Sequence, residues 1–219
     1  MNVEYLSHFG DDLMVVNAAR CSMSKWHDAF DDVTDRNLIR YLAKHDHWSP
    51  FAHPKIQLRL HLPIFVARQW EKHRIGALRG YDINDHSEVS RRYVDDAPTI
   101  FYPETWRSRP DGSIKQGSGS DLDEVGQAKA RHAYTEAVEH CVDAYERLLE
   151  IGVAPEQARM VLPQSMETTF IETGSLAYWA RCYGLRADGH AQSEIQRVAE
   201  AVAGHVAPLF PVSWAALTS

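Results

Sequence analysis

The sequence predicts an α+β fold in which helices cover a small, mainly antiparallel sheet, and two segments carry most of that prediction. Residues 55–62 alternate strictly between polar odd positions and apolar even positions, which is the period of a half-buried strand. Residues 123–150 form a long helical segment that stops at Gly152, and glycine is typical of helix ends. The chain shows no internal repeat and no domain boundary, so we expect one domain spanning 1–219.

Before the strand at 55–62, the pattern of apolar residues is weaker. Residues 3–18 alternate loosely and predict two short strands joined by a turn at 10–12. A short helix is expected to begin at Asn17 and to reach about Ser24.

A second helix is expected to end at Lys44, with Asp32 or Thr34 as its cap. Residues 45–53 should follow it as a loop, because Pro50 disfavours helical geometry at the residue before it. Both expectations depend on local signals rather than on a long apolar pattern.

After the strand, proline and glycine mark where helices begin and end. Pro63 suits the first turn of a helix that ends in the basic residues Lys72 to Arg74. Residues 107–122 are rich in Gly, Ser and Pro and predict a mobile surface loop. Further helices are expected in three places: a short one from about residue 154, one over about 174–185, and one from 191 to about 205.

Composition excludes several classes of protein. A net charge of −7 argues against broad binding to nucleic acid or to a membrane surface. No apolar run is long enough to span a membrane, and the N-terminus lacks the basic and apolar regions of a signal peptide. The three cysteines are far apart and form no CxxC, which suits a reducing cytoplasm. We therefore expect a cytoplasmic protein without disulfides.

Positive charge is concentrated in residues 63–93, against the overall sign of the chain. Guanidinium groups pair with phosphate oxygens in a bidentate fork, so this basic cluster indicates a phosphate site. A solvated surface rich in ion pairs accounts for the same charges and stays open on charge alone. The cluster has six members: Arg68, Lys72, Arg74, Arg79, Arg91 and Arg92.

Other catalytic and cofactor motifs are missing from the sequence. The twelve histidines include no HExxH and no Cys/His spacing typical of zinc sites, so we predict no metal. Ser90 lies between Glu88 and Arg92 without a GxSxG elbow, which favours a phosphate donor over a nucleophile. No GxGxxG or P-loop is present, so any nucleotide must be held by side chains and helix ends.

Several motifs in the same order resemble the flavin-dependent thymidylate synthases, the ThyX family. Residues 47–53 read HWSPFAH, and 63–74 read PIFVARQWEKHR. SEVSRRY follows at 87–93, ARMVLP at 158–163 and LRADGHAQSEI at 185–195. The similarity covers about residues 12 to 210, which is almost the whole chain.

The resemblance implies a homotetramer whose active sites are shared between subunits. Members of the family bind FAD and a pyrimidine nucleotide, and they transfer a methylene group from methylenetetrahydrofolate to carbon 5 of dUMP. The reduced flavin then supplies a hydride, and NADPH reduces the flavin. A related activity, methylation of UMP in nucleoside-antibiotic pathways such as that for polyoxin, is the second hypothesis. A non-catalytic nucleotide-binding module that keeps the fold is the third.

The resemblance also assigns roles to individual residues. Arg186 lies beside the uracil ring, and it is predicted to be catalytic together with Ser90 and His47. The predicted substrate-binding residues are Gln69, Glu88, Ser90, Arg92, Arg159 and Arg186. The predicted cofactor-binding residues are His47, Ser49, Lys72, His73, Arg74, Glu156, Ser175, Arg181 and His190.

The sequence departs from the family pattern near the expected nucleotide. Lys72 stands where the family has arginine, so the charge is kept but the planar fork is lost. Ser175 and Arg181 replace typical asparagines near the flavin. Thirteen residues separate Arg74 from Glu88, several more than is usual. This longer loop motivates the hypothesis that the substrate is UMP, because extra residues there can accommodate a 2′-hydroxyl.

Overall fold

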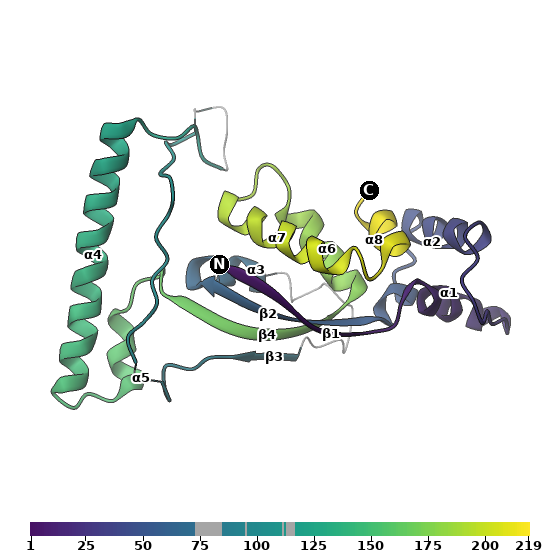
Figure 1. The fold of residues 1–219 in the computed structure, drawn as a ribbon, viewed down its shortest axis with the longest axis horizontal. Helices are drawn as coiled ribbons and strands as arrows, with labels where there is room; N and C mark the ends of the chain where they lie inside the picture. Colours follow the sequence, from purple (N-terminus) through teal and green to yellow (C-terminus); the bar gives the residue numbers. More distant parts are fainter. Residues whose placement is uncertain (73–84, 95, 111, 113–116) are drawn as a thin grey trace. The chain divides into compact units, whose positions relative to one another are not determined.

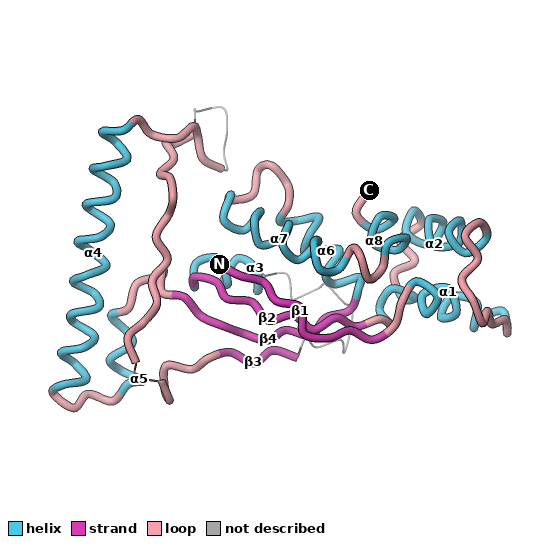
Figure 2. The backbone as a smooth tube through the Cα atoms, in the orientation of Figure 1, coloured by secondary structure: helices cyan, strands magenta, loops and turns pink. Residues whose placement is uncertain are grey.

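A four-stranded sheet in the order β1–β2–β4–β3 organises the computed structural model, which describes every residue except 73–84, 95, 111 and 113–116 (Figures 1 and 2). The sheet is antiparallel and helices accompany it, so the predicted α+β class is confirmed. The strands are β1 (Asn2–Phe9), β2 (Lys55–Pro63), β3 (Asp85–Glu88) and β4 (Glu167–Ser175).

The chain forms two compact units, and each draws on separate stretches of sequence. Unit 1 comprises Met1, residues 61–68 and residues 88–169. Unit 2 comprises residues 2–60, 69–87 and 170–219. Strands β2, β3 and β4 contribute residues to both units. The expectation of one domain over 1–219 stays a prediction.

The central strand β2 confirms the period-two prediction. Its even positions Ile56, Leu58, Leu60 and Leu62 are fully buried, while the odd positions 55 to 61 are not. Four buried aliphatic side chains on one face supply a large apolar contribution to folding, about 1.5–3 kcal/mol each. The partner strand β4 was not predicted from the sequence.

The first helix corrects an expectation. The second strand predicted within residues 3–18 is wrong, because Asp12–Arg20 is helix α1. Asp11 caps this helix, since its side chain accepts a hydrogen bond from the backbone N–H of Met14 at 2.9 Å. Val15 and Val16 are both fully buried. Adjacent apolar residues of this kind suit a helix face as well as a strand, so the loose alternation misled the prediction.

Helix α2 (Thr34–Lys44) is confirmed, but the residue that caps it was wrongly predicted. Neither Asp32 nor Thr34 provides the cap. The Oδ1 atom of Asp31 instead accepts from the backbone N–H groups of Val33 at 3.0 Å and Thr34 at 2.6 Å. The loop that follows α2 contains one 3₁₀ turn, Ser49–Ala52.

Unit 2 gathers its remaining helices around α1, α2 and β1. Helix α7 (Ser193–Val206) packs on β1 and on α6 (Leu176–Arg186), as Figures 1 and 2 show. Helix α8 (Pro211–Leu217), which was not predicted, packs on α2 and α6. Its first turn is held by Asp12, whose two carboxylate oxygens accept from the N–H groups of Val212 at 2.8 Å and Ser213 at 2.9 Å.

Unit 1 is built on the long helix α4 (Glu124–Glu150), which confirms the prediction for residues 123–150. The side chain of Asp123 caps α4 by accepting from Gly126 N at 2.8 Å. Helix α4 packs on α5 (Pro155–Ala158) and on the 3₁₀ turn that follows α5 (Figure 1). The predicted loop at 107–122 falls partly outside the described residues.

Helix α3 (Ile64–Glu71) follows β2 directly. Pro63 is the last residue of β2, so the expectation that it lies in the first turn of the helix is wrong. Lys72 follows the end of α3, and His73 and Arg74 lie outside the described residues. Among the described helices, none is both long and apolar enough to cross a membrane.

Candidate functional site

A cavity of about 780 Å³ in unit 1 brings together part of the basic cluster. Arg68 reaches it from α3, Arg91 from the turn after β3, and Arg159 from the residue after α5. Ser90 and Glu88 also line it. The carboxylates of Asp96 and Glu167 line it as well. This surface, called the unit 1 cavity below, therefore brings three guanidinium groups, the hydroxyl of Ser90 and three carboxylates to one space.

The turn after β3 is held against the start of β4. Val89 donates its backbone N–H to the carbonyl of Thr169 at 2.9 Å, and Tyr93 N donates to Ser90 O at 3.0 Å. Glu88 accepts from the hydroxyl of Thr168 at 2.7 Å. These bonds fix the backbone on both sides of Ser90, so the position of its hydroxyl in the cavity is set by the strand edge.

Two of the predicted residues in unit 1 pair with each other. The Nε atom of Arg92 lies 3.4 Å from a carboxylate oxygen of Glu156, and both side chains are about half exposed. Arg159 donates from Nε to the backbone carbonyl of Glu156 at 3.2 Å. Such an exposed ion pair stabilises the fold weakly, so an anionic ligand can replace Glu156 as the partner of Arg92 at little cost.

The unit 1 cavity therefore unites Glu88, Ser90 and Arg159 from the predicted substrate set. Arg92 and its ion-pair partner Glu156 are not among the residues that line it. Arg68 and Arg91 were counted in the basic cluster but not among the predicted site residues, although they line the same cavity. Arg91 also contacts Asp96, at 3.6 Å between Nη1 and Oδ1. Their charge was the available signal, and without the fold it did not separate them from surface arginines.

A second group of predicted residues lies in unit 2. The guanidinium of Arg186 donates to the backbone carbonyl of Gln69, and the Gln69 side chain donates to Gln192 Oε1 at 2.6 Å. Burial lowers the pKa of Arg186 from its ordinary value. Its Nε atom is buried and has no hydrogen-bond partner among the described residues. A buried donor of this kind is costly unless a ligand accepts from it.

A buried polar network lies next to this group in unit 2. The carboxylate of Glu172, fully buried on β4, accepts from Trp70 Nε1 and from the hydroxyl of Tyr178, each at 2.9 Å. Ser175 is also fully buried, and its hydroxyl accepts from Tyr178 N at 3.2 Å to cap α6. That contact is structural, and the predicted cofactor role of Ser175 stays a prediction.

A second cavity, of about 1070 Å³, belongs entirely to unit 2. Arg40 and Lys44 reach it from α2 and Arg181 from α6, while Asp46 and Trp48 line it from the loop after α2. This surface is called the unit 2 cavity below. Of the predicted cofactor-binding residues, Arg181 lies here.

The remaining predicted cofactor residues are exposed or lie outside the described part of the chain. His47 and Ser49 are exposed on either side of Trp48, and the His47 ring lies 6.0 Å from that of Tyr41. Lys72 is exposed at the end of α3. His73 and Arg74 lie outside the described residues.

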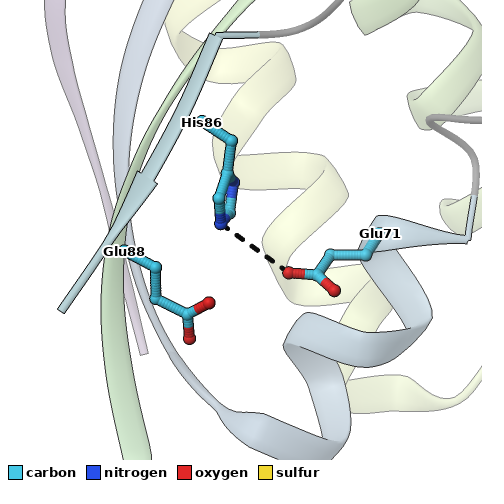
Figure 3. Close-up of side chains that lie close together, drawn as sticks. All are labelled: Glu71, His86 and Glu88. Carbon is cyan, nitrogen blue, oxygen red and sulfur yellow. Dashed lines mark ion pairs between the residues drawn. The ribbon is translucent and has the colours of Figure 1, made fainter. Parts of the chain in front are cut away.

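His190 is exposed and bonds to Asp188 at 2.9 Å. The backbone N–H and the ring of His190 lower the pKa of the Asp188 carboxyl. His86 lies beside Glu71, with 3.8 Å between its Nε2 and a carboxylate oxygen (Figure 3). The prediction that the chain binds no metal stays a prediction.

Comparison with known proteins gives a consistent result over nearly the whole chain. Residues 4–212 match the family described as thymidylate synthase complementing protein. The flavin-dependent thymidylate synthase of Kosmotoga olearia is 39% identical over 207 residues, which cover 94% of this chain and 85% of that protein. The enzyme of the same name from Thermus thermophilus is 36% identical over 214 residues, covering 98% of this chain and 74% of its own.

A solved structure agrees with these relatives. The UMP/dUMP methylase PolB from Streptomyces cacaoi, bound with 5-Br dUMP, superposes with a TM-score of 0.84 at 32% identity. The match covers 99% of this chain and 94% of that one. Sequence and fold therefore agree on one family, and the motifs that carry the resemblance lie on the two cavities and on the Gln69–Arg186 pair. The chain is an enzyme that belongs to the flavin-dependent thymidylate synthase family.

Proposed function

We propose that this enzyme methylates carbon 5 of a uridylate, converting dUMP to dTMP, with methylenetetrahydrofolate as carbon donor and NADPH as reductant. The observation that carries the proposal is the unit 1 cavity, where Arg68, Arg91 and Arg159 line the same space as Ser90. A nucleoside monophosphate carries nearly two negative charges, and charge-assisted bonds from guanidinium groups are the strong way to hold it.

Arg186 is proposed to act on the pyrimidine ring. Its unpartnered Nε is a buried donor, and burial strengthens any bond that it makes to a carbonyl oxygen carrying developing negative charge. Such charge forms on the uracil as carbon 5 becomes nucleophilic. The bond from Arg186 to the backbone of Gln69 orients the guanidinium in advance.

A protein thiolate is not part of the proposal. Burial raises the pKa of the Cys182 thiol to about 12, so that side chain stays protonated at neutral pH. Activation of the ring is then assigned to electrostatic stabilisation by Arg186, with Ser90 and His47 as the other predicted catalytic residues.

The donor set of unit 2 fits a flavin dinucleotide, because cationic side chains and an exposed tryptophan line one large cavity. Arg181 is proposed to hold FAD, together with His47, Ser49, Lys72, His73, Arg74, Glu156, Ser175 and His190 as the family resemblance implies. When bound, the flavin supplies the electrons that reduce the transferred carbon to a methyl group. The protein residues bind and orient it.

Turnover of dUMP and UMP, measured side by side with FAD, NADPH and methylenetetrahydrofolate, tests the proposal. We expect tritium release from 5-tritiated dUMP, with a higher kcat/KM than for UMP. The UMP-methylating alternative is favoured by the similarity to PolB, which is a UMP/dUMP methylase. A preference for UMP would establish that alternative, and nucleotide binding without tritium release would leave the non-catalytic module.

Replacing one arginine of the unit 1 cavity links turnover to the site. In Arg159→Ala we expect KM for the nucleotide to rise about 10- to 100-fold, because one charged hydrogen bond contributes about 1.5–3 kcal/mol. Arg59→Ala is the matched control, since Arg59 pairs with Glu4 at 3.2 Å and lines neither cavity. An unchanged KM in the Arg159 variant would show that the phosphate of the nucleotide does not bind in this cavity.

A further inference from the structure

The face of α2 that lines the unit 2 cavity carries two like charges one helical turn apart. Arg40 and Lys44 are in an i,i+4 relation, where like charges repel each other. At the start of α2, the same four-residue spacing joins opposite charges instead, since Asp32 and Arg36 form an ion pair at 2.9 Å. A helix able to form such pairs therefore keeps an unfavourable one where it borders the cavity.

A third cation meets these two from another element. Arg181 on α6 lines the same cavity, so three positive side chains face one volume of about 1070 Å³. Within the described part of the chain, Arg40, Lys44 and Arg181 form no ion pair with a carboxylate within 4 Å. Asp46 and Ser219 also line the cavity, and Asp46 pairs with none of the three cations. Three cationic side chains therefore share the lining with one carboxylate side chain.

An aromatic side chain completes the lining. Trp48 is 39% exposed in the loop after α2, which leaves part of its indole open to a ligand. Cations that pair with phosphate oxygens, beside an aromatic surface that stacks on a planar ring, are the donor set that a nucleotide requires. The cavity volume exceeds what a single phosphate needs and is large enough for part of a dinucleotide.

We propose that Arg40 and Lys44, together with Arg181, bind the diphosphate of a dinucleotide in the unit 2 cavity. The inference deepens the proposed function, on which it rests, because that reaction needs two dinucleotides, FAD and NADPH. Both carry the same diphosphate, so the experiment must distinguish them. Helix α2, which none of the family motifs reaches, thereby gains a binding role.

Titration of the purified full chain with FAD and, separately, with NADPH tests this assignment at one fixed ionic strength. We expect Arg40→Gln and Lys44→Gln each to raise the Kd of one of the two dinucleotides about tenfold, since each loses a charge-assisted bond. Arg40→Lys keeps the charge and should retain most of the affinity. Arg36→Gln is the matched control on the same helix, and its Kd should equal that of the wild type. Thermal melts of all variants confirm that they are folded.

The two arms give separate outcomes. A higher Kd confined to FAD assigns the cavity to the flavin, and one confined to NADPH assigns it to the reductant. Unchanged Kd values for both ligands in the folded Arg40 and Lys44 variants would overturn the inference. A wild type that binds a dinucleotide through Arg40 and Lys44 but does not methylate uridylate would uphold the inference and overturn the proposed function. The two failures are therefore distinguishable.

Discussion

Arg186 combines a fixed backbone contact with a buried nitrogen that has no partner among the described residues. If this nitrogen stabilises charge on the uracil, Arg186→Ala should lower kcat about 100- to 1000-fold, the effect of losing one oxyanion donor. FAD binding, followed by flavin absorbance, should be retained. Arg186→Lys should recover only part of the rate, because lysine lacks the planar fork. Near-normal turnover in the alanine variant would contradict the role in polarising the ring.

The thiol of Cys182 makes stability depend on alkaline pH. Burial raises its pKa from 9.0 to about 12 in the folded chain. The stabilisation from the protonated thiol is complete below pH 9 and is lost as the pH rises towards 12, because the unfolded chain loses its proton first. Burial also raises the pKa of Tyr178, which adds to the same trend.

The free energy of unfolding of the wild type should therefore fall between about pH 8 and pH 10. In Cys182→Ala we expect this fall to be smaller by about 1 kcal/mol. Urea unfolding followed by circular dichroism at the two pH values measures this difference. Cys21→Ala is the control, since Cys21 is exposed. Parallel losses in all three proteins would show that folding does not raise the pKa of Cys182.

Among the elements, α1 depends on one cap. Asp11→Ala removes the acceptor for Met14 N and should lower the free energy of unfolding by about 1 kcal/mol. Asp11→Asn keeps a capping oxygen and should lower it by only a few tenths. Chemical denaturation of the three proteins distinguishes these outcomes, and equal stability of the alanine variant would mean that the cap is not needed.

How far an element can be predicted from sequence depends on where its partners lie in the chain. Strand β2 and helix α4 carry their own signals, a strict alternation in one and an Asp123 cap with a glycine stop in the other. Strand β4 places the carboxylate of Glu172 at a fully buried position, which breaks the apolar pattern that identifies a strand. The donors of Trp70 and Tyr178, brought in by the fold, help to make that burial acceptable.

How far the candidate site can be predicted also depends on where the partners of each residue lie in the chain. Ser90 and Arg159 were found through motifs, and the fold adds that they share a cavity with Arg68 and Arg91. The cations of the unit 2 cavity were not recognised, apart from Arg181. Arg40 and Lys44 belong to no motif, and their relation to Arg181 exists only once α2 and α6 are folded.

For the whole molecule, the family resemblance predicts a homotetramer with shared active sites. We expect light scattering after size exclusion to give a mass four times that of one chain. Dilution that dissociates the assembly should reduce turnover per chain, because each site would lose residues from its neighbours. A monomer with full activity would contradict both the assembly and the sharing of sites.

Asp12 supports a helix 200 positions further along the chain, since it accepts from the first N–H groups of α8. The acceptor is therefore synthesised about 200 residues before its donors. While the ribosome is still making the protein, this buried carboxylate has to stay hydrated, so the early segment cannot settle into its final packing. Unit 2 is therefore expected to acquire its native structure only after α8 has emerged from the exit tunnel.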